Sequence, residues 1–122
     1  MPVTYRFDSN IVVLETIGEY SMDDIRNTII NSLADSHCPT SPCILVDLSE
    51  SRSIYNRSSE DVKAMARSLT SFGNRFNNRI ALVAQKDLVY GLMRMGSVFS
   101  EELGVKAEIF RTFAEARKWL LP

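Results

Sequence analysis

Two aspartates, Asp47 and Asp87, occupy the positions in this sequence that best suit catalytic chemistry. Each follows a short apolar run of strand length. The run CILV comes directly before Asp47, and the run IALVA is separated from Asp87 by Gln85 and Lys86. Carboxylates at the ends of neighbouring parallel strands can share a divalent cation. A third carboxylate at the end of an earlier strand is missing, because Glu15 is predicted to lie within its strand. We therefore favour structural roles, in which Asp47 ends a strand and Asp87 caps a helix, over a metal-dependent enzyme.

The remaining residues with catalytic or metal-binding side chains form no recognisable constellation. The single histidine, His37, precedes the two cysteines, Cys38 and Cys43, in the segment HCPTSPC. A structural zinc site needs four ligands in closer pairs than this C-x4-C spacing supplies. A Ser-His-acid triad is disfavoured, because His37 is predicted to follow the first helix, near the opposite edge of the sheet from the acids. We predict no catalytic residues, no metal, no cofactor and no enzymatic activity.

Polar side chains gather at the predicted carboxyl edge of the sheet. Open sheets with parallel strands bind ligands beyond the carboxyl ends of those strands. The residues expected at this edge are Asp47, Ser49, Tyr55, Ser58, Gln85, Lys86 and Asp87. We predict that a ligand or partner contacts Asp47, Ser49 and Tyr55.

The segment 87–103 predicts a helix that is apolar on more than one side. One stripe contains Leu88, Leu92, Met95 and Phe99, and a second contains Val89, Tyr90, Met93 and Gly96. Phe72, Gly73 and Phe76, near the end of the preceding helix, are expected on the same surface. Such a helix needs a second apolar neighbour. Three interpretations stay open: a thick core, a homodimer interface, or a pocket for a small apolar or lipid-like ligand lined by Phe72, Phe76, Tyr90 and Met93.

The elements that must position these residues alternate between strands and helices. Strands are predicted at 3–7, from 11 until Gly18 ends it, and at 43–48, 79–84 and 105–110. Helices are predicted from 21, from 58, at 87–103 and at 112–120. Ser21 is expected to cap the first helix, and Thr112 with Glu115 to form a capping box for the last. The order ββαβαβαβα indicates an α/β fold, with a five-stranded, mostly parallel sheet and one antiparallel edge strand from an N-terminal hairpin.

Composition limits the class of protein. The chain has 122 residues, a formal net charge of −1 and a pI near 5.8, so we expect a single domain over 1–122 and no nucleic-acid partner. The N-terminal MPVTYRFDSN lacks the pattern of a secretory signal, and no apolar run has the length of a membrane span. We therefore expect a cytoplasmic protein without a transmembrane segment, with both cysteines reduced.

Three segments carry a resemblance to a known family: ILVDLSE at 44–50, DLVYGLMRMGSVFSEELGVKAEIFR at 87–111 and TFAEARKWL at 112–120. With the element order, they resemble the SpoIIAA-like (STAS/CRAL-TRIO-like) group of the STAS superfamily. In the anti-sigma factor antagonists of that superfamily, a partner kinase phosphorylates a serine at the start of the second helix. The resemblance assigns this role to Ser58, or else Ser59. Glu60 departs from the glycine usually found after that serine pair.

These observations favour a non-enzymatic protein-interaction or regulatory module. The first alternative is binding or carriage of a small apolar or lipid-like ligand. The second is a phosphoserine-regulated protein that resembles the anti-sigma factor antagonists.

Overall fold

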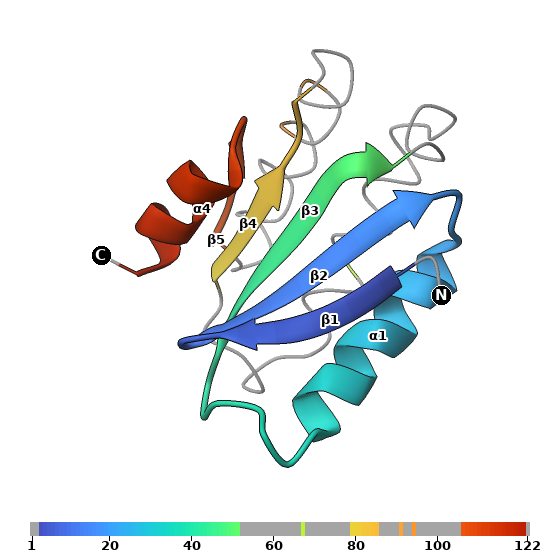
Figure 1. Cartoon of the computed structure of the whole chain (residues 1–122), viewed down its shortest axis with the longest axis vertical. Helices are drawn as coiled ribbons and strands as arrows, with labels where there is room; N and C mark the ends of the chain where they lie inside the picture. The colour runs from blue at the N-terminus through green and yellow to red at the C-terminus, as the bar shows by residue number, and fades with distance from the viewer. Residues whose placement is uncertain are drawn as a thin grey trace.

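Among the described residues, the sheet contains five strands in the spatial order β1-β2-β3-β4-β5 (Figure 1). The computed structural model describes residues 3–51, 67, 79–85, 91, 94 and 106–121. The strands are β1 (Val3–Asp8), β2 (Ile11–Gly18), β3 (Cys43–Ser51), β4 (Arg79–Val83) and β5 (Lys106–Phe110). β1 runs antiparallel to β2, and the other neighbours are parallel. The predicted fold class is therefore confirmed.

A two-residue turn connects the antiparallel pair. Asp8 pairs with Ile11, and Ser9 between them has a positive φ of 53°. The Asp-Ser-Asn turn chemistry favoured a hairpin at this position, and the structure has one.

β3 is longer than its apolar run predicted. The strand predicted at 43–48 continues through polar residues to Ser51. The reason is pairing with β2, because Ile17 and Gly18 lie opposite Glu50 and Ser51 in the parallel register. Hydrogen bonds to a neighbouring strand extend a strand through residues whose own preferences are weak.

Two helices are described along their whole length, α1 (Met22–Ala34) and α4 (Phe113–Leu120). The predicted helices that begin at 58 and 87 lie mostly outside the described residues, although Arg67, Gly91 and Arg94 are helical. The cap of α1 is confirmed, since Ser21 Oγ accepts from the Asp24 N–H at 3.2 Å and the Ser21 N–H donates to Asp24 Oδ2 at 2.8 Å.

The cap of α4 differs from the predicted capping box in one bond. Thr112 Oγ1 accepts from the Glu115 N–H at 3.2 Å, as expected. The Glu115 carboxylate, however, accepts from the Thr112 hydroxyl at 3.0 Å. The helix start is fixed in either arrangement, because the threonine oxygen satisfies one unpaired N–H of the first turn.

The two helices cover opposite faces of the sheet (Figure 1). Successive side chains of β3 point to opposite faces, so Ile44 packs in the cluster of α1 and Leu45 in that of α4. Neither side chain is exposed to solvent. Burial on both faces explains the continuous apolar run of this strand.

α4 is tied to the sheet at both sides of its buried stripe. Trp119 packs against Phe110 with ring centroids 5.7 Å apart, and the Arg79 guanidinium lies 4.7 Å from the Trp119 centroid. On the other side, Arg117 forms two hydrogen bonds with Asp8, at 2.8 and 3.1 Å. These bonds hold the pKa of Asp8 below its ordinary value. The last helix is thereby joined to the first hairpin.

Two isoleucines allow a matched test of this packing. Ile29 on α1 is completely buried, whereas Ile17 on β2 is 58% exposed. We expect Ile29→Ala to lower the free energy of unfolding by about 2–5 kcal/mol. Ile17→Ala should change it by no more than about 0.5 kcal/mol. Urea unfolding of both variants measures the difference, and similar losses would contradict the packing described here.

Candidate functional site

The parallel strands β2 to β5 end at one edge of the sheet, and a bulge in β3 shapes that edge. Glu15 pairs with Asp47, but Ile17 pairs with Glu50, so β3 contains one residue more than β2 between these pairs. The Ser49 N–H donates to Asp47 Oδ1 at 2.9 Å, and Thr16 Oγ1 donates to the Asp47 carbonyl at 3.0 Å. Asp47 therefore holds the backbone of the bulge within β3. The prediction that Asp47 ends the strand is wrong, because β3 continues to Ser51 through its pairing with β2.

Glu15 lies within β2, as predicted. The parallel register places it directly opposite Asp47 on the adjacent strand, a neighbourhood that the sequence did not indicate. The Glu15 carboxylate accepts from Arg6 Nε at 2.9 Å. Within the described ranges, no group of three or more His, Cys, Asp or Glu side chains is arranged to hold a metal ion.

The same edge contains a bridge between β4 and β5. Arg111 Nη1 donates to the Gln85 carbonyl at 2.8 Å, and the Ala84 N–H donates to the Phe110 carbonyl at 2.9 Å. Gln85 was predicted at this edge, but Arg111 was not. The sequence did contain a signal for Arg111, because this basic residue stands between the end of a predicted strand and the cap of the following helix.

Ile17 is the second residue that sequence reasoning missed. Among the described residues, Ile17 is the large hydrophobic residue that is exposed to solvent, with 58% of its surface accessible. It is the next-to-last residue of β2 and precedes Gly18, whose φ is +69°. The sequence analysis made no prediction for Ile17, and its pairing with Glu50 near the end of β3 shows that it lies close to the carboxyl edge.

Several predicted site residues lie outside the described residues. They are Tyr55, Ser58, Phe72, Phe76, Tyr90 and Met93, together with Lys86 and Asp87. Of the predicted edge, Asp47, Ser49 and Gln85 are described. Asp47 is the middle residue of β3, Ser49 lies two residues before the end of that strand, and Gln85 follows the end of β4. The apolar pocket and the dimer interface on the second and third helices stay predictions.

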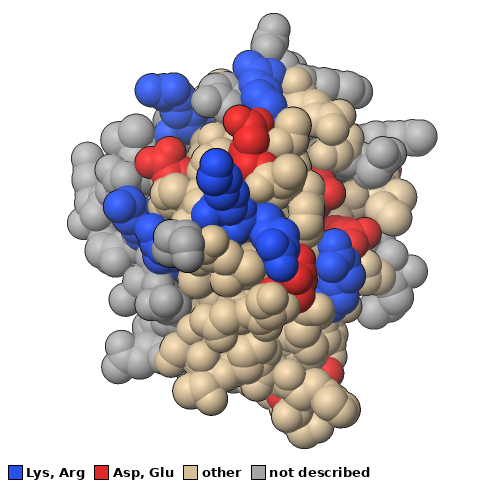
Figure 2. All heavy atoms as spheres, turned by 60° about the vertical axis from the view of Figure 1, so that its left-hand side comes forward, with Lys and Arg blue, Asp and Glu red and all other residues tan. Residues whose placement is uncertain are grey.

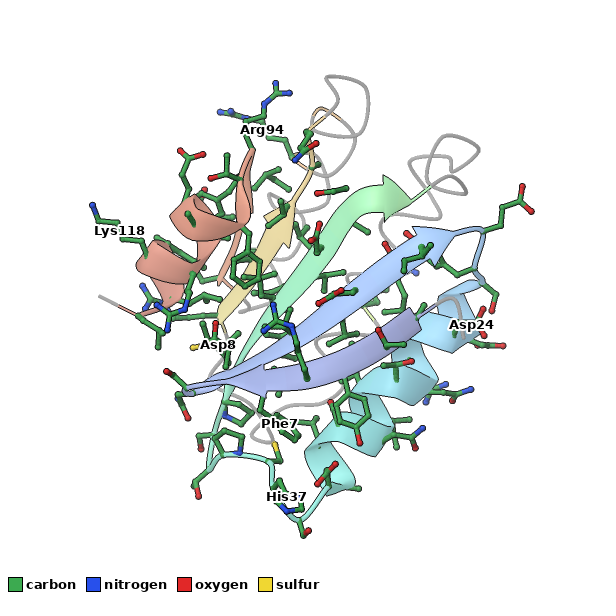
Figure 3. The ribbon with its side chains drawn as sticks, in the orientation of Figure 1. Phe7, Asp8, Asp24, His37, Arg94 and Lys118 are labelled. Atoms are coloured by element: carbon green, nitrogen blue, oxygen red, sulfur yellow. The ribbon has the colours of Figure 1, made fainter. Side chains whose placement is uncertain are left out.

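The only histidine lies far from this edge, just beyond α1 (Figure 3). Asp35 Oδ1 accepts from the His37 N–H at 2.8 Å, and His37 Nδ1 lies 3.1 Å from the same oxygen. Asp35 Oδ2 accepts from the Tyr5 hydroxyl at 2.8 Å. The backbone bond from His37, followed by the bond from Tyr5, lowers the pKa of Asp35, and the carboxylate raises the pKa of Tyr5.

The cysteines occupy the predicted places. Cys43 is the first residue of β3 and is buried, and Cys38 lies in the preceding loop. Both are thiols. Burial, and then the nearby Asp35 carboxylate, raises the pKa of Cys38, so its thiolate is disfavoured.

Charges of both signs are interspersed on the face that carries α4 (Figure 2). Two ion pairs account for part of this pattern, Arg6 with Glu15 and Arg117 with Asp8. A nucleic-acid-binding face presents clustered basic side chains instead. Among its described residues, this face is therefore suited to mixed polar contacts.

The arrangement defines an α/β domain with an antiparallel hairpin at one sheet edge and a candidate binding edge at the carboxyl ends of the parallel strands. The SpoIIAA-like family model matches residues 11–121, and the chain belongs to this family. No curated protein sequence gives a significant match. In the described part, no helix is long and apolar enough to span a membrane.

Two solved structures share the fold over nearly the whole chain. An uncharacterized protein of the DUF3478 family from Shewanella loihica PV-4, with a SpoIIAA-like fold, has 15% identity and a TM-score of 0.61, covering 97% of this chain and 91% of that one. An anti-sigma factor antagonist from Mycobacterium paratuberculosis has 17% identity and a TM-score of 0.63, covering 98% of this chain and 93% of that one. At these identities the likeness concerns the fold.

The contacts of Asp35 predict an acid-dependent part of stability. Its folded-state pKa lies below the unfolded-state value of about 3.9, so its contribution is fully present above that value. It is lost as the pH falls through the folded-state pKa. We expect the free energy of unfolding, measured by urea titration between about pH 6 and pH 2, to fall less steeply in Asp35→Asn than in the unaltered protein.

Glu108→Gln, which removes an exposed carboxylate on β5, is the control. It should leave most of the acid dependence in place, because Asp35 and Asp8 keep their hydrogen bonds. Equal slopes for Asp35→Asn and the unaltered protein would show that the Tyr5 and His37 bonds do not couple Asp35 to folding.

Proposed function

We propose that the protein is a non-enzymatic regulatory module that binds a protein partner at the carboxyl edge of its sheet. The observation that carries the proposal is the exposed Ile17 beside the Asp47–Ser49 bulge. Membership of the SpoIIAA-like family supports an interaction role. The fold likeness to an anti-sigma factor antagonist supports a regulatory one.

The chemistry of the edge suits a protein partner. Ile17 offers an apolar side chain that a partner can bury, while Ser49, Gln85 and Arg111 supply a polar surround. An apolar centre with a polar rim is the usual composition of a non-obligate interface. The Asp47 carboxylate and the Arg111 guanidinium already bond to the backbone, so they keep the edge in a fixed shape before a partner arrives.

The replacement Ile17→Asp tests this edge. A carboxylate at the centre of the interface would be buried without a partner, so we expect binding to weaken by at least about tenfold, or 1.4 kcal/mol. The measurement is affinity capture from an extract of the source organism, followed by calorimetry with the purified captured protein. Because Ile17 is exposed in the unbound protein, the fold should tolerate the change.

Asn27→Asp, at an exposed position of α1, introduces the same charge elsewhere and is the matched control. A protein that binds the unaltered chain and the control but not Ile17→Asp would support the proposal. Equal capture by all three forms would place the partner surface elsewhere.

A second candidate is phosphoserine regulation, which the fold likeness to an anti-sigma factor antagonist favours. The resemblance assigns the modified serine to Ser58, in the segment that follows β3. We expect the chain to gain one phosphate when incubated with ATP and an extract of its source organism, as measured by intact mass spectrometry. The gain should vanish in Ser58→Ala and persist in Ser59→Ala. A gain that persists in Ser58→Ala, or no gain in any form, would contradict this assignment.

A further inference from the structure

Two cations stand side by side where β4 and β5 begin. Arg79 is the first residue of β4 and Lys106 the first of β5, and the parallel register pairs them directly. Arg79 contacts Trp119 of α4, so it points to the face of the sheet that this helix covers. Lys106 points to the same face, because residues paired in a parallel register share a face, and neighbouring strands lie about 4.8 Å apart. One ligand group can therefore reach both side chains.

The positive charges of this pair are not neutralised within the protein. Among the residues that the structure describes, no carboxylate forms an ion pair with either cation. Glu108, two residues further along β5, is paired in register with Ala81 instead of Arg79. Like charges directly opposite each other on neighbouring strands destabilise a sheet. The sheet thus retains an electrostatic cost at this point, which a bound anion would relieve.

Trp119 holds the Arg79 guanidinium in a defined place. The guanidinium carbon lies 4.7 Å from the centroid of the indole ring, and that ring packs against Phe110 with centroids 5.7 Å apart. A guanidinium stacked on an aromatic face keeps N–H donors at its edge, and these can bond to both oxygens of a carboxylate. Arg79 is half-buried and Lys106 is exposed, so a carboxylate can approach from solvent.

The other cations of α4 are engaged elsewhere or point away. Arg117 bonds to Asp8, and Figure 3 shows Lys118 extending from α4 away from the sheet. Figure 1 shows the start of β4 beside the end of α4, which brings the indole ring to the two cations. We call Arg79, Lys106 and Trp119 together the Trp119 site.

The occupant of this site has to supply more than a negative charge. Ion pairs that stay exposed to water are individually weak, so Lys106 would hold a free inorganic anion poorly. The half-buried Trp119 offers an apolar surface beside the two charges. Tryptophan and arginine are enriched among the residues that dominate the binding energy of protein interfaces. A protein segment can bring a carboxylate and an apolar side chain together, whereas a free anion brings charge alone.

We propose that the Trp119 site binds an acidic segment of a partner protein. A carboxylate of the segment bonds to Arg79 and Lys106, and a neighbouring apolar side chain packs on the open part of the indole ring. The proposal goes beyond the proposed function, because Ile17 lies near the carboxyl end of β2, whereas the two cations lie at the amino ends of β4 and β5. These strands are parallel, so the two surfaces lie at opposite ends of the sheet and can be tested separately.

Trp119 is the only tryptophan in the chain, so its fluorescence reports on this site directly. The probe is a library of capped octapeptides without Trp or Tyr, in which Glu or Asp alternates with Leu, Ile, Val or Ser, selected on the full-length protein. A selected peptide should change the fluorescence of Trp119 saturably. The same peptide with Gln and Asn in place of Glu and Asp should bind at least about tenfold more weakly, because it lacks the carboxylates.

Lys106→Glu separates binding from stability. It should weaken peptide binding at least about tenfold, while the melting temperature stays equal or rises, because the new carboxylate lies opposite Arg79 and turns a repulsion into an attraction. Arg26→Glu makes the same change of charge at an exposed position of α1, on the other face of the sheet, and is the matched control. It should bind the peptide within about twofold of the unaltered protein.

Three results would overturn the proposal. The first is equal peptide binding by Lys106→Glu and the unaltered protein. The second is a selection that yields no peptide whose binding depends on its carboxylates. The third is a saturable change of Trp119 fluorescence with inorganic phosphate alone, at the concentrations at which the peptides bind, which would indicate a small anion as the occupant.

This proposal and the proposed function fail in different ways. Ile17→Asp should retain the fluorescence response to the peptide. Absence of that response with Ile17-dependent capture intact would reject the Trp119 site alone. A Lys106-dependent response without any Ile17-dependent partner would reject the carboxyl edge alone.

Discussion

Burial of the central strands on both faces is the constraint on which the rest of the structure depends. Ile44 and Leu45 are adjacent in β3, point to opposite faces and are both completely buried. A single covering layer would leave one of these faces in water, at a cost of roughly 25 cal/mol for each Å² of apolar surface. The fold therefore places α1 on one face and α4 on the other, and the Arg117–Asp8 bonds fasten α4 to the first hairpin.

Parallel pairing then concentrates the polar groups at one edge. The strands β2 to β5 all end there, and the bulge in β3 turns Asp47 toward the Ser49 N–H. The Arg111 guanidinium similarly donates a hydrogen bond to the Gln85 carbonyl. These charged side chains hold the backbone, and Ile17 is exposed near them. The contact surface proposed for this edge rests on that combination.

The sheet order also leaves β1 and β5 as the edge strands. Edge strands offer unpaired backbone groups, which makes them sites of strand addition. α1 packs against β1 and covers the core on that face of the sheet.

Local features of this protein were determined by its sequence. Three such features depend only on residues that are neighbours in sequence, so the residue types predict them. They are the turn at Ser9–Asn10, the cap at Ser21 and the apolar run that begins β3 at Cys43. Only the tertiary structure decided that Glu15 lies opposite Asp47, that β3 continues to Ser51, and that Arg117 reaches Asp8. Each of these depends on register or packing between distant segments, 109 residues apart for Arg117 and Asp8, and no local preference encodes such a contact. Ile17 illustrates the difference, because an apolar residue type gives no sign that this side chain is exposed near the end of β2.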